Sequence, residues 1–538
     1  MPEPFAFMRG IALVSTLALA GCAAASLSLA PDRPDAPYHP AGDETTENEN
    51  GVQKVRPVPN PRDYTLPPVA GAAVSLRESR IDDRHVYTLA ELIDLAQSKN
   101  PETRVAWEEA RQAALGVGMV KALYLPALSA IAVGGGQTES GSTQLGVLPS
   151  TPSNGHLDGT ISSVSLQWLI FDFGARDALA QSAKELSSAR NIVFNGVHQR
   201  IIYNVTRTFQ EYSVARQRTA IAQRSKAESA NIRDAAAAKY RQGVGTSVET
   251  AQANQLYAQA TFDLVQAQNA ERDAYDSLIA AVGISPLSVL HMQDVSNRPL
   301  AAMSAAPVER MIAEAVARRP DIQASLATAR AATAGIKAAE ADLLPKVFVS
   351  ASDTYATGNL SLTSLPNFSS LIPLGSSPSG LSPSPSSIPS PSSVLGNASL
   401  NRNDTTVLGG VTFPIFDGGL RDARIREAQS RANAAEATTQ RLEQTAATEV
   451  IAASDSLRSS VAAYTAATAL VATSVVTEDA TLAAYKSGAG TFTAAVEAQR
   501  ALLAARLAQA QAHGTALIAA ATVAFSTGRI SGGAPPRI

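Results

Sequence analysis

Charged and aromatic side chains are scarce in this sequence. Of its 538 residues, 17% are charged and 5% are aromatic, and the formal net charge is −3. Proteins that bind nucleic acids usually carry a basic patch and an excess of lysine and arginine. The composition shows no such excess, so the sequence gives no indication of a nucleic-acid partner.

The sequence also lacks the motifs of common catalytic and metal sites. Cys22 is the only cysteine, which excludes an intramolecular disulfide, and the six histidines do not have metal-ligand spacing. Gly488-Ala489-Gly490 lacks the preceding strand and the further glycine of a dinucleotide-binding loop. No nucleophile elbow or P-loop occurs. We therefore expect no catalytic residue, no metal, no cofactor and no enzymatic activity.

Proline is absent from two long stretches, 154–285 and 415–534, although the chain has 30 prolines. Both stretches are rich in good helix formers, and a proline inside a helix costs about 3 kcal/mol. We therefore expect one helix of 69 residues over Gly174–Gln242, followed by a turn and an antiparallel return helix. The second stretch repeats this plan.

Long apolar runs are missing as well. After the N-terminus no uninterrupted run reaches the roughly 20 residues of a membrane-spanning helix, which predicts that there is none. The run Ile11–Ala20 follows Arg9, is too short to span, and ends in Leu19-Ala20-Gly21-Cys22, which resembles a lipobox. We expect residues 1–21 to be a lipoprotein signal peptide, starting at Met1 or Met8, and Cys22 to carry the lipid. The alternative is an ordinary signal peptide with a chance cysteine.

Residues 22–84 carry nine prolines and an acidic, polar stretch at 43–50. Such a composition has little capacity to form a core and predicts an extended periplasmic tether.

The rest of the chain contains one pattern twice, at a constant offset of 245 residues. Ile170-Phe171-Asp172-Phe173-Gly174 corresponds to Ile415-Phe416-Asp417-Gly418-Gly419, and Tyr240-Arg241-Gln242-Gly243-Val244-Gly245-Thr246 corresponds to Tyr485-Lys486-Ser487-Gly488-Ala489-Gly490-Thr491. The copies end at Gly283 and Gly528. So long a period predicts a duplicated domain.

Each copy is expected to run helix, strand, loop, strand, long helix, turn, helix. A helical pattern begins at Tyr87, and a second helix begins at Pro101 and ends before Pro126; Met311, Pro320 and Pro345 repeat this. The expected strands are 127–133 and 163–171 in the first copy and 347–352 and 406–416 in the second. The expected loops between them are 134–161 and 355–404, the latter with a Pro/Ser-rich segment. We place the repeats at 85–283 and 308–528, with a linker at 284–307 and a tail at 529–538.

The return helix of the second copy carries an apolar series at spacings of 3, 4 and 7 residues, which predicts a coiled-coil seam. The series is Phe492, Val496, Leu503, Leu507, Ala510 and Leu517. If the protein is embedded in a membrane, it must use its strands. Four strands cannot close a barrel alone, so they would be shared between subunits.

Taken in this order and duplicated, these features resemble the TolC-like outer-membrane efflux family, in particular its lipoprotein branch that partners inner-membrane RND transporters. The resemblance covers about Tyr87–Gly528. It implies a mixed α and β membrane protein that forms a homotrimer. Its strands would form one 12-stranded outer-membrane β-barrel, continued by a periplasmic α-helical coiled-coil barrel. It also implies a lipid-anchored location in the outer membrane, in contact with outer-membrane lipid.

The resemblance further implies that the two helical turns form the periplasmic tip, where an adaptor (membrane fusion) protein docks. The tip residues would be Tyr240, Gly243, Gly245, Thr246, Tyr485, Gly488, Gly490 and Thr491. Both tyrosines could instead be packing residues. Family members often have two acidic residues lining the aperture past the turn; here Glu249 and Glu497 match, whereas Ala494 departs from the pattern. Glu497 could equally be a solvated surface residue.

At the strand-to-helix junctions the resemblance singles out Asp172, Gly174, Asp417 and Gly419, and we expect the two aspartates to cap the long helices. The favoured function is a passive exit duct for small molecules in a tripartite efflux pump. The alternatives are the outer duct of a type I protein secretion system and a coiled-coil surface lipoprotein without a pore. The sequence names neither the substrate nor the particular pump and adaptor, nor whether the tip is closed at rest.

Overall fold

The computed structural model of the protein describes residues 82, 84–143, 151–295, 300, 307–358 and 402–530. All of them belong to the second of two compact units of the chain, Glu78–Ile538. The expected signal peptide, Cys22, most of the tether and the segment 359–401 lie outside the described residues.

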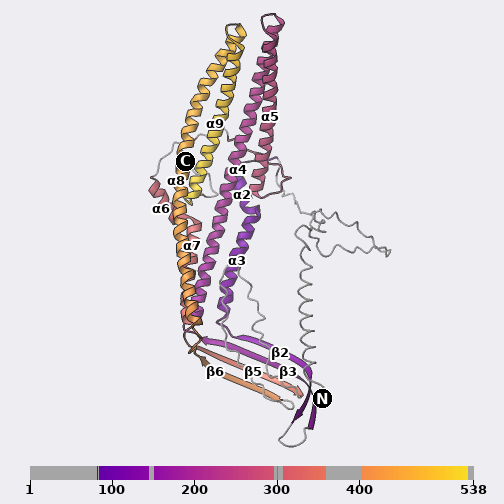
Figure 1. Ribbon diagram of the computed structural model, residues 1–538, viewed down its shortest axis with the longest axis vertical. Helices are drawn as coiled ribbons and strands as arrows, with labels where there is room; N and C mark the ends of the chain where they lie inside the picture. The colour runs from indigo at the N-terminus through magenta and orange to yellow at the C-terminus, as the bar shows by residue number, and fades with distance from the viewer. Residues whose placement is uncertain are drawn as a thin grey trace, which may run out of the picture. The chain divides into compact units, whose positions relative to one another are not determined.

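Within this unit one order of elements occurs twice (Figure 1). The first copy consists of α2 (Leu89–Lys99), α3 (Pro101–Ala122), β2 (Ala127–Thr143), β3 (Thr151–Phe171), α4 (Ala175–Arg241) and α5 (Ser247–Val282). The second consists of α6 (Val308–Arg318), α7 (Pro320–Ala341), β5 (Lys346–Gly358), β6 (Arg402–Thr412), α8 (Leu420–Ser487) and α9 (Phe492–Ser526). Two short strands, β1 (Val86–Tyr87) and β4 (His291–Met292), pair in parallel, so β4 lies within the expected linker.

The shorter helices begin where local chemistry favours a start. Pro101 and Pro320 are the first residues of α3 and α7, where the missing N–H costs no hydrogen bond. Thr88 and Glu91 form a reciprocal capping box at α2. The expectation that this first helix begins at Tyr87 is wrong, because Tyr87 is extended and pairs with Met292.

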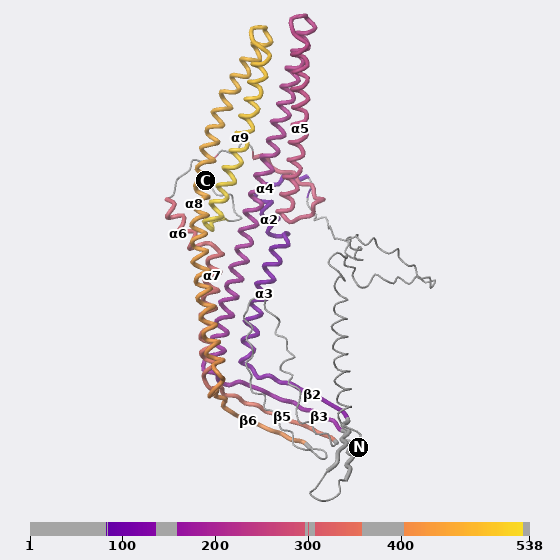
Figure 2. The backbone as a smooth tube through the Cα atoms, viewed as in Figure 1, coloured from indigo at the N-terminus to yellow at the C-terminus, as the bar shows by residue number. Residues whose placement is uncertain are grey.

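The long helices α4 and α8 have 67 and 68 residues, close to the 69 expected for the first. The pairs α4–α5 and α8–α9 are antiparallel hairpins (Figure 2), and α4 packs against α7 and α9 of the other copy. Arg506 on α9 forms a 2.9 Å ion pair with Glu228 on α4. Among the helices, α4 thus provides the contacts between the two copies.

The largest core cluster lies where α2, α4, α5 and α9 meet, around fully buried Leu92, Val205, Phe209 and Leu278. Around α7 the packing depends instead on alanine, since Ala327, Ala331 and Ala338 are all buried. Small side chains let helix backbones approach closely, and there the Ser182 hydroxyl donates to the Ala331 carbonyl at 2.9 Å.

The predicted coiled-coil seam is partly misplaced. Phe492, Ala510 and Leu517 are buried, but Val496, Leu503 and Leu507 are only half-buried, whereas Leu502 and Ala505 are almost fully buried. The reason is that α9 contacts both α8 and α4. A helix with two partners buries a broader face than a two-helix seam requires.

The strands form one antiparallel sheet in the order β2-β3-β5-β6. They extend well past the expected boundaries: β2 and β3 pair from Ala127↔Gln167 to Thr143↔Thr151, through most of the expected loop. The Gly, Ser and Thr content suggested a loop, but cross-strand hydrogen bonds keep these residues extended. The last strand begins and ends earlier than expected: β6 runs from Arg402 to Thr412 and stops two residues before Pro414, which cannot donate to the ladder.

One helix of the described residues, α8, contains a stretch that is long and apolar enough to cross a membrane by length and composition. This differs from the sequence expectation. The alanines, valines and threonines of 459–477, with no charged residue among them, raise the mean hydropathy without forming an uninterrupted apolar run. The same helix packs against α7 and α9 within the chain.

Candidate functional site: paired helical turns and strand-to-helix junctions

The turn between α4 and α5 requires its two glycines for different reasons. Gly243 has a φ of 75°, in the left-handed region that only glycine enters at little cost. Gly245 has no such backbone, but a Cβ there would lie 2.9 Å from the backbone nitrogen of Tyr240. Its own N–H donates to the Lys239 carbonyl at 3.1 Å, which closes the turn.

The turn between α8 and α9 repeats this geometry. Gly488 has a φ of 85°, and a Cβ on Gly490 would lie 3.0 Å from the Cβ of Ala484. The Gly490 N–H donates to the Ala484 carbonyl at 2.9 Å. The threonines that follow cap the return helices: Thr246 accepts from the Glu249 N–H at 3.1 Å, and Thr491 accepts from the Ala494 N–H at 3.2 Å.

The structure brings the two turns together through Lys239 and Tyr485. The Lys239 ammonium donates to the Tyr485 carbonyl and lies 4.1 Å from the centre of the Tyr485 ring. Tyr485 is 2% exposed and packs edge-on against Phe492 at 5.7 Å, in a cluster with Ile232 and Ala236 of the first hairpin. The second turn is therefore anchored on the first.

The two tyrosines at equivalent positions have different environments. Tyr240 is 52% exposed, whereas Tyr485 is buried, and among the described residues its hydroxyl has no hydrogen-bond partner. Burial and, to a smaller extent, the nearby charge of Glu249 raise the pKa of the Tyr485 phenol. Tyr485 is thus a packing residue, and only Tyr240 presents its ring at the surface.

The two acidic residues past the turns also differ. Glu497 is exposed, between the buried residues Ala495 and Ala498. Glu249 is half-buried, and its charge helps to raise the pKa of the Tyr485 phenol. The role of Lys239, which joins the turns, was not predicted from the sequence; the available signal was that Ala484 occupies the equivalent position in the second copy.

At the first strand-to-helix junction, Asp172 and Arg176 form a buried pair. The Asp172 carboxylate accepts from the backbone and side-chain N–H groups of Arg176, each at 2.9 Å. The Arg176 guanidinium also donates to the carbonyls of Leu123, Leu169 and Ile170 at 2.7–3.1 Å and lies over the Tyr124 ring at 4.7 Å. One side chain thus joins the end of α3, the end of β3 and the start of α4.

The second junction has the same sequence pattern but is less enclosed. Asp417 accepts from Gly419 and Arg421 N–H groups and pairs with the Arg421 side chain at 2.8 Å, with both side chains 25% exposed. Gly174 and Gly419 have φ of 93° and 85° and stand just before the long helices. The roles of Arg176 and Arg421 were not predicted from the sequence, although each lies four residues after the junction aspartate.

The described residues contain no group of three or more His, Cys, Asp or Glu side chains placed to hold a metal ion.

Solved structures with the same fold include outer-membrane channels. The channel OprN superposes with a TM-score of 0.63 and 21% identity, over 82% of this chain and 89% of OprN. VceC of Vibrio cholerae superposes with a TM-score of 0.62 and 18% identity, over 82% of this chain and 96% of VceC. At these identities the likeness concerns the fold alone.

Among curated proteins, Protein CyaE of Bordetella pertussis is 28% identical over 285 residues, which are 50% of this chain and 54% of CyaE. The chain thus spans about half the length of this relative. The family model for "Outer membrane efflux protein" matches twice, at residues 92–284 and 311–529, which together are more than half of the sequence. The chain therefore belongs to the outer membrane efflux protein family.

Proposed function

We propose that three copies of this chain form an outer-membrane exit duct through which a tripartite efflux pump passes small molecules out of the periplasm. The duct is passive: its strands cross the outer membrane, its helices extend into the periplasm, and its turns receive an adaptor protein coupled to an inner-membrane RND transporter. The observation that carries this proposal is the two-faced sheet.

Residues paired directly across the strands share a face of the sheet, and the pairing register separates an apolar face from a polar one. The apolar face consists mainly of Leu128, Ala130, Val164, Leu166, Trp168, Val349, Ala351, Val407 and Val411. Its polar members are Asp353 and Thr405, whose hydroxyl donates to the Asp353 carboxylate at 2.6 Å, and, farther along the strands, Thr160, Ser162, Thr357 and Asn403. Several apolar residues are widely exposed, among them Leu128 at 72% and Val407 at 69%.

The opposite face is mostly polar, with interruptions at Ile131, Val133, Ile161, Leu169, Phe348 and Leu408. Its polar members are Ser129, Ser163, Ser165, Gln167, Ser350, Ser352, Thr354 and Thr406. Hydroxyl pairs link it across strands, Ser129 with Ser165 at 2.7 Å and Ser163 with Thr354 at 3.0 Å. Alternation of an apolar with a polar face is typical of strands that separate lipid from a water-filled lumen.

Strand lengths and edges favour sharing between copies. The strands have 11 to 21 residues, and a tilted strand needs about 9–11 to cross a bilayer. Within the described residues β2 and β6 each have one neighbour, so each leaves one edge unpaired, which lipid does not tolerate. Pairing β6 of one copy with β2 of the next closes 12 strands in three copies.

Cysteine cross-linking tests this arrangement. In a Cys22→Ser background, Ala130→Cys on β2 is combined with cysteines at positions 403, 405, 407 and 409 of β6 in turn. Two strands lie between β2 and β6 of one chain, so their backbones are about 14 Å apart. That separation is too large for a disulfide within the chain. We expect one register to give covalent trimers, and purified trimers to conduct in planar bilayers; single-cysteine variants are the control.

A monomer without conductance in mild detergent would instead favour a surface lipoprotein with no pore. To separate drug efflux from protein secretion through the same duct, the gene is deleted and complemented. Loss of drug export with unchanged protein secretion supports efflux, and the reverse result supports secretion.

Lipid anchoring at Cys22 is part of the proposal. Cys22→Ser should abolish incorporation of labelled palmitate, because no other cysteine is available for the thioether. The duplicated body should still fold and form trimers. Palmitate incorporation into Cys22→Ser protein would show that the lipobox assignment is wrong.

The exposed Glu497 is expected to line the aperture near the three-fold axis. Three carboxylates around one opening attract cations, and mobile salt screens them. Glu497→Gln should therefore reduce the cation preference of the conductance, measured as a shift of the reversal potential, more at 0.01 M than at 1 M salt (roughly 30 Å against 3 Å of screening length). An unchanged reversal potential at low salt would place Glu497 on the outer surface of the duct.

A further inference from the structure

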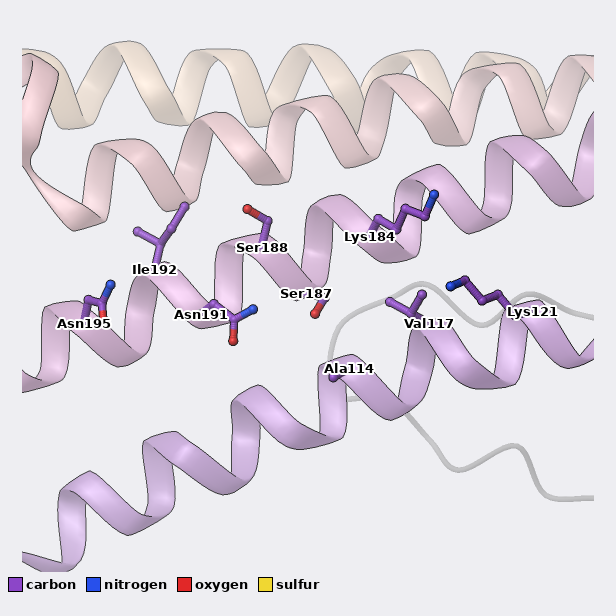
Figure 3. A pocket seen from close by; sticks show the side chains of 9 residues that line it. All are labelled: Ala114, Val117, Lys121, Lys184, Ser187, Ser188, Asn191, Ile192 and Asn195. Carbon is purple, nitrogen blue, oxygen red and sulfur yellow. The ribbon is translucent and has the colours of Figure 1, made fainter.

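A groove of about 500 Å³ lies between α3 and α4 of the first copy. Figure 3 shows its lining: the side chains of Lys121 and Lys184 lie near one another at one end, with Ser187, Asn191 and Asn195 along α4. All these polar side chains can donate hydrogen bonds, so the groove has the chemistry of an anion site.

The charge pattern along the same helix pair changes at this groove. Glu102 pairs with Arg200 at 3.1 Å, and Glu109 faces Arg190 at 3.7 Å. Each of these two ion pairs joins an acidic residue on α3 to a basic residue on α4. These pairs define antiparallel packing. The same packing brings Lys121 opposite Lys184. Two positive charges therefore meet here, whereas the two ion pairs farther along the helices join opposite charges.

Among the described residues, the acidic side chains nearest in sequence to the two lysines have other partners. Segment 110–122 of α3 has no acidic residue. On α4 the acidic residues nearest in sequence to Lys184 have other partners: Asp177 accepts from the Tyr124 hydroxyl, and Glu185 faces Arg330 at 3.7 Å. Within the described part of the chain, neither lysine is in an ion pair.

The second copy supplies an internal comparison. Helix α7 has 22 residues, the same length as α3, and its residue equivalent to Lys121 is Glu340. At the repeat offset of 245, Gln429 on α8 is equivalent to Lys184. Because the second helix pair packs without the two lysines, packing does not require them in the first copy.

Position suggests the source of the anion. Lys121 is the last residue but one of α3, and β2 begins at Ala127. The exposed aromatic residues Trp168, Phe171 and Phe173 lie at the end of β3, as in the aromatic belt where a membrane meets water. Lys184 is nine residues beyond the start of α4, about 14 Å along the helix. Lysine side chains at such a level reach towards lipid headgroups.

We propose that this groove binds the phosphate group of an anionic phospholipid in the periplasmic leaflet of the outer membrane, held between Lys121 and Lys184 with hydrogen bonds from Ser187 and Asn191. The inference rests on the proposed function, since the headgroups lie at this level only if the strands cross the membrane. A free phosphate ion would use the same groups, and the experiment separates the two sources.

The test converts the site into its second-copy equivalent with Lys121→Glu and Lys184→Gln together. The control, Lys337→Glu with Lys99→Gln, makes the same charge change at two exposed lysines outside the groove and the turns. Purified trimers are incubated with phosphatidylglycerol or phosphatidylcholine, and retained lipid is counted by native mass spectrometry. Binding of inorganic phosphate to the same proteins is followed by phosphorus NMR. Conductance is measured on every sample.

We expect wild type and control to retain phosphatidylglycerol over phosphatidylcholine. A lysine near a membrane surface contributes about fivefold to binding of anionic lipid, so the double variant should lose about 25-fold. Equal retention by the double variant and the control would overturn the proposal. So would inorganic phosphate binding that depends on the lysines while lipid retention does not. If wild-type trimers do not conduct, the result counts against the proposed duct. If they conduct but do not prefer phosphatidylglycerol, the result counts only against this lipid site.

Discussion

Arg176→Met should destabilise the body by about 3–5 kcal/mol, the usual cost of removing one partner from a buried ion pair. The Asp172 and Arg176 side chains are only 7% and 8% exposed. Without the guanidinium, the Asp172 charge stays buried, and the carbonyls of Leu123, Leu169 and Ile170 lose their donor. Because the same group joins α3, β3 and α4, we expect a lower thermal midpoint by circular dichroism in detergent and a smaller yield of trimer.

The second copy provides the matched control. Arg421→Met breaks the equivalent pair with Asp417, but both side chains there are 25% exposed, and Arg421 donates to no carbonyl among the described residues. Water solvates the charge that remains when a partly exposed ion pair is broken. Arg421→Met should therefore lower the free energy of unfolding by about 1 kcal/mol or less. Equal shifts of the midpoint for the two variants would contradict the structural role assigned to Arg176.

Gly488→Val should abolish drug export while the protein still reaches the outer membrane. Gly488 has a φ of 85°, where a β-branched residue is a genuine outlier. The strain, about 1–2 kcal/mol for an ordinary residue and more for valine, can be relieved only by rebuilding the turn that we propose as the docking surface. The measurements are drug susceptibility of a complemented deletion strain, trimer content of outer-membrane fractions, and co-purification of the adaptor protein.

Gly488→Asn is the control, because asparagine enters the left-handed region far more readily than valine. We expect it to retain most export. If cells with Gly488→Val keep wild-type drug resistance, the second turn is not part of the docking interface. Loss of the protein from the outer membrane would mean that the turn is needed for folding, and docking would then be tested with Tyr240→Ala, whose ring is exposed at the first turn.

Much of the element order follows from local chemistry and was predictable. Pro101 and Pro320 begin helices of equal length, the glycine pairs stand at both turns, and the proline-free stretches became helices of 67 and 68 residues. The errors came where cross-strand or helix–helix contacts decide. Ser- and Gly-rich segments read as loops are paired strands, and the seam of α9 is shifted because two helices contact it.

In the candidate site, too, some features could be predicted from the sequence and others depend on tertiary packing. The conformational demands of Gly243 and Gly488 can be read from the sequence, since they concern the φ of a single residue. Tyr240 and Tyr485 occupy equivalent positions in the two copies, and only the packing of one hairpin on the other exposes the first and buries the second.

By itself, the sequence determined the duplication, the two helical hairpins, the turns and the family, because each depends on residues close together in the chain or on a repeated spacing. Only the tertiary structure decided that Lys239 binds the second turn, that Arg176 joins three elements, and that Lys121 faces Lys184. These contacts join residues that are far apart in the sequence. Their free energies depend on burial and on neighbouring partners, which no local pattern records.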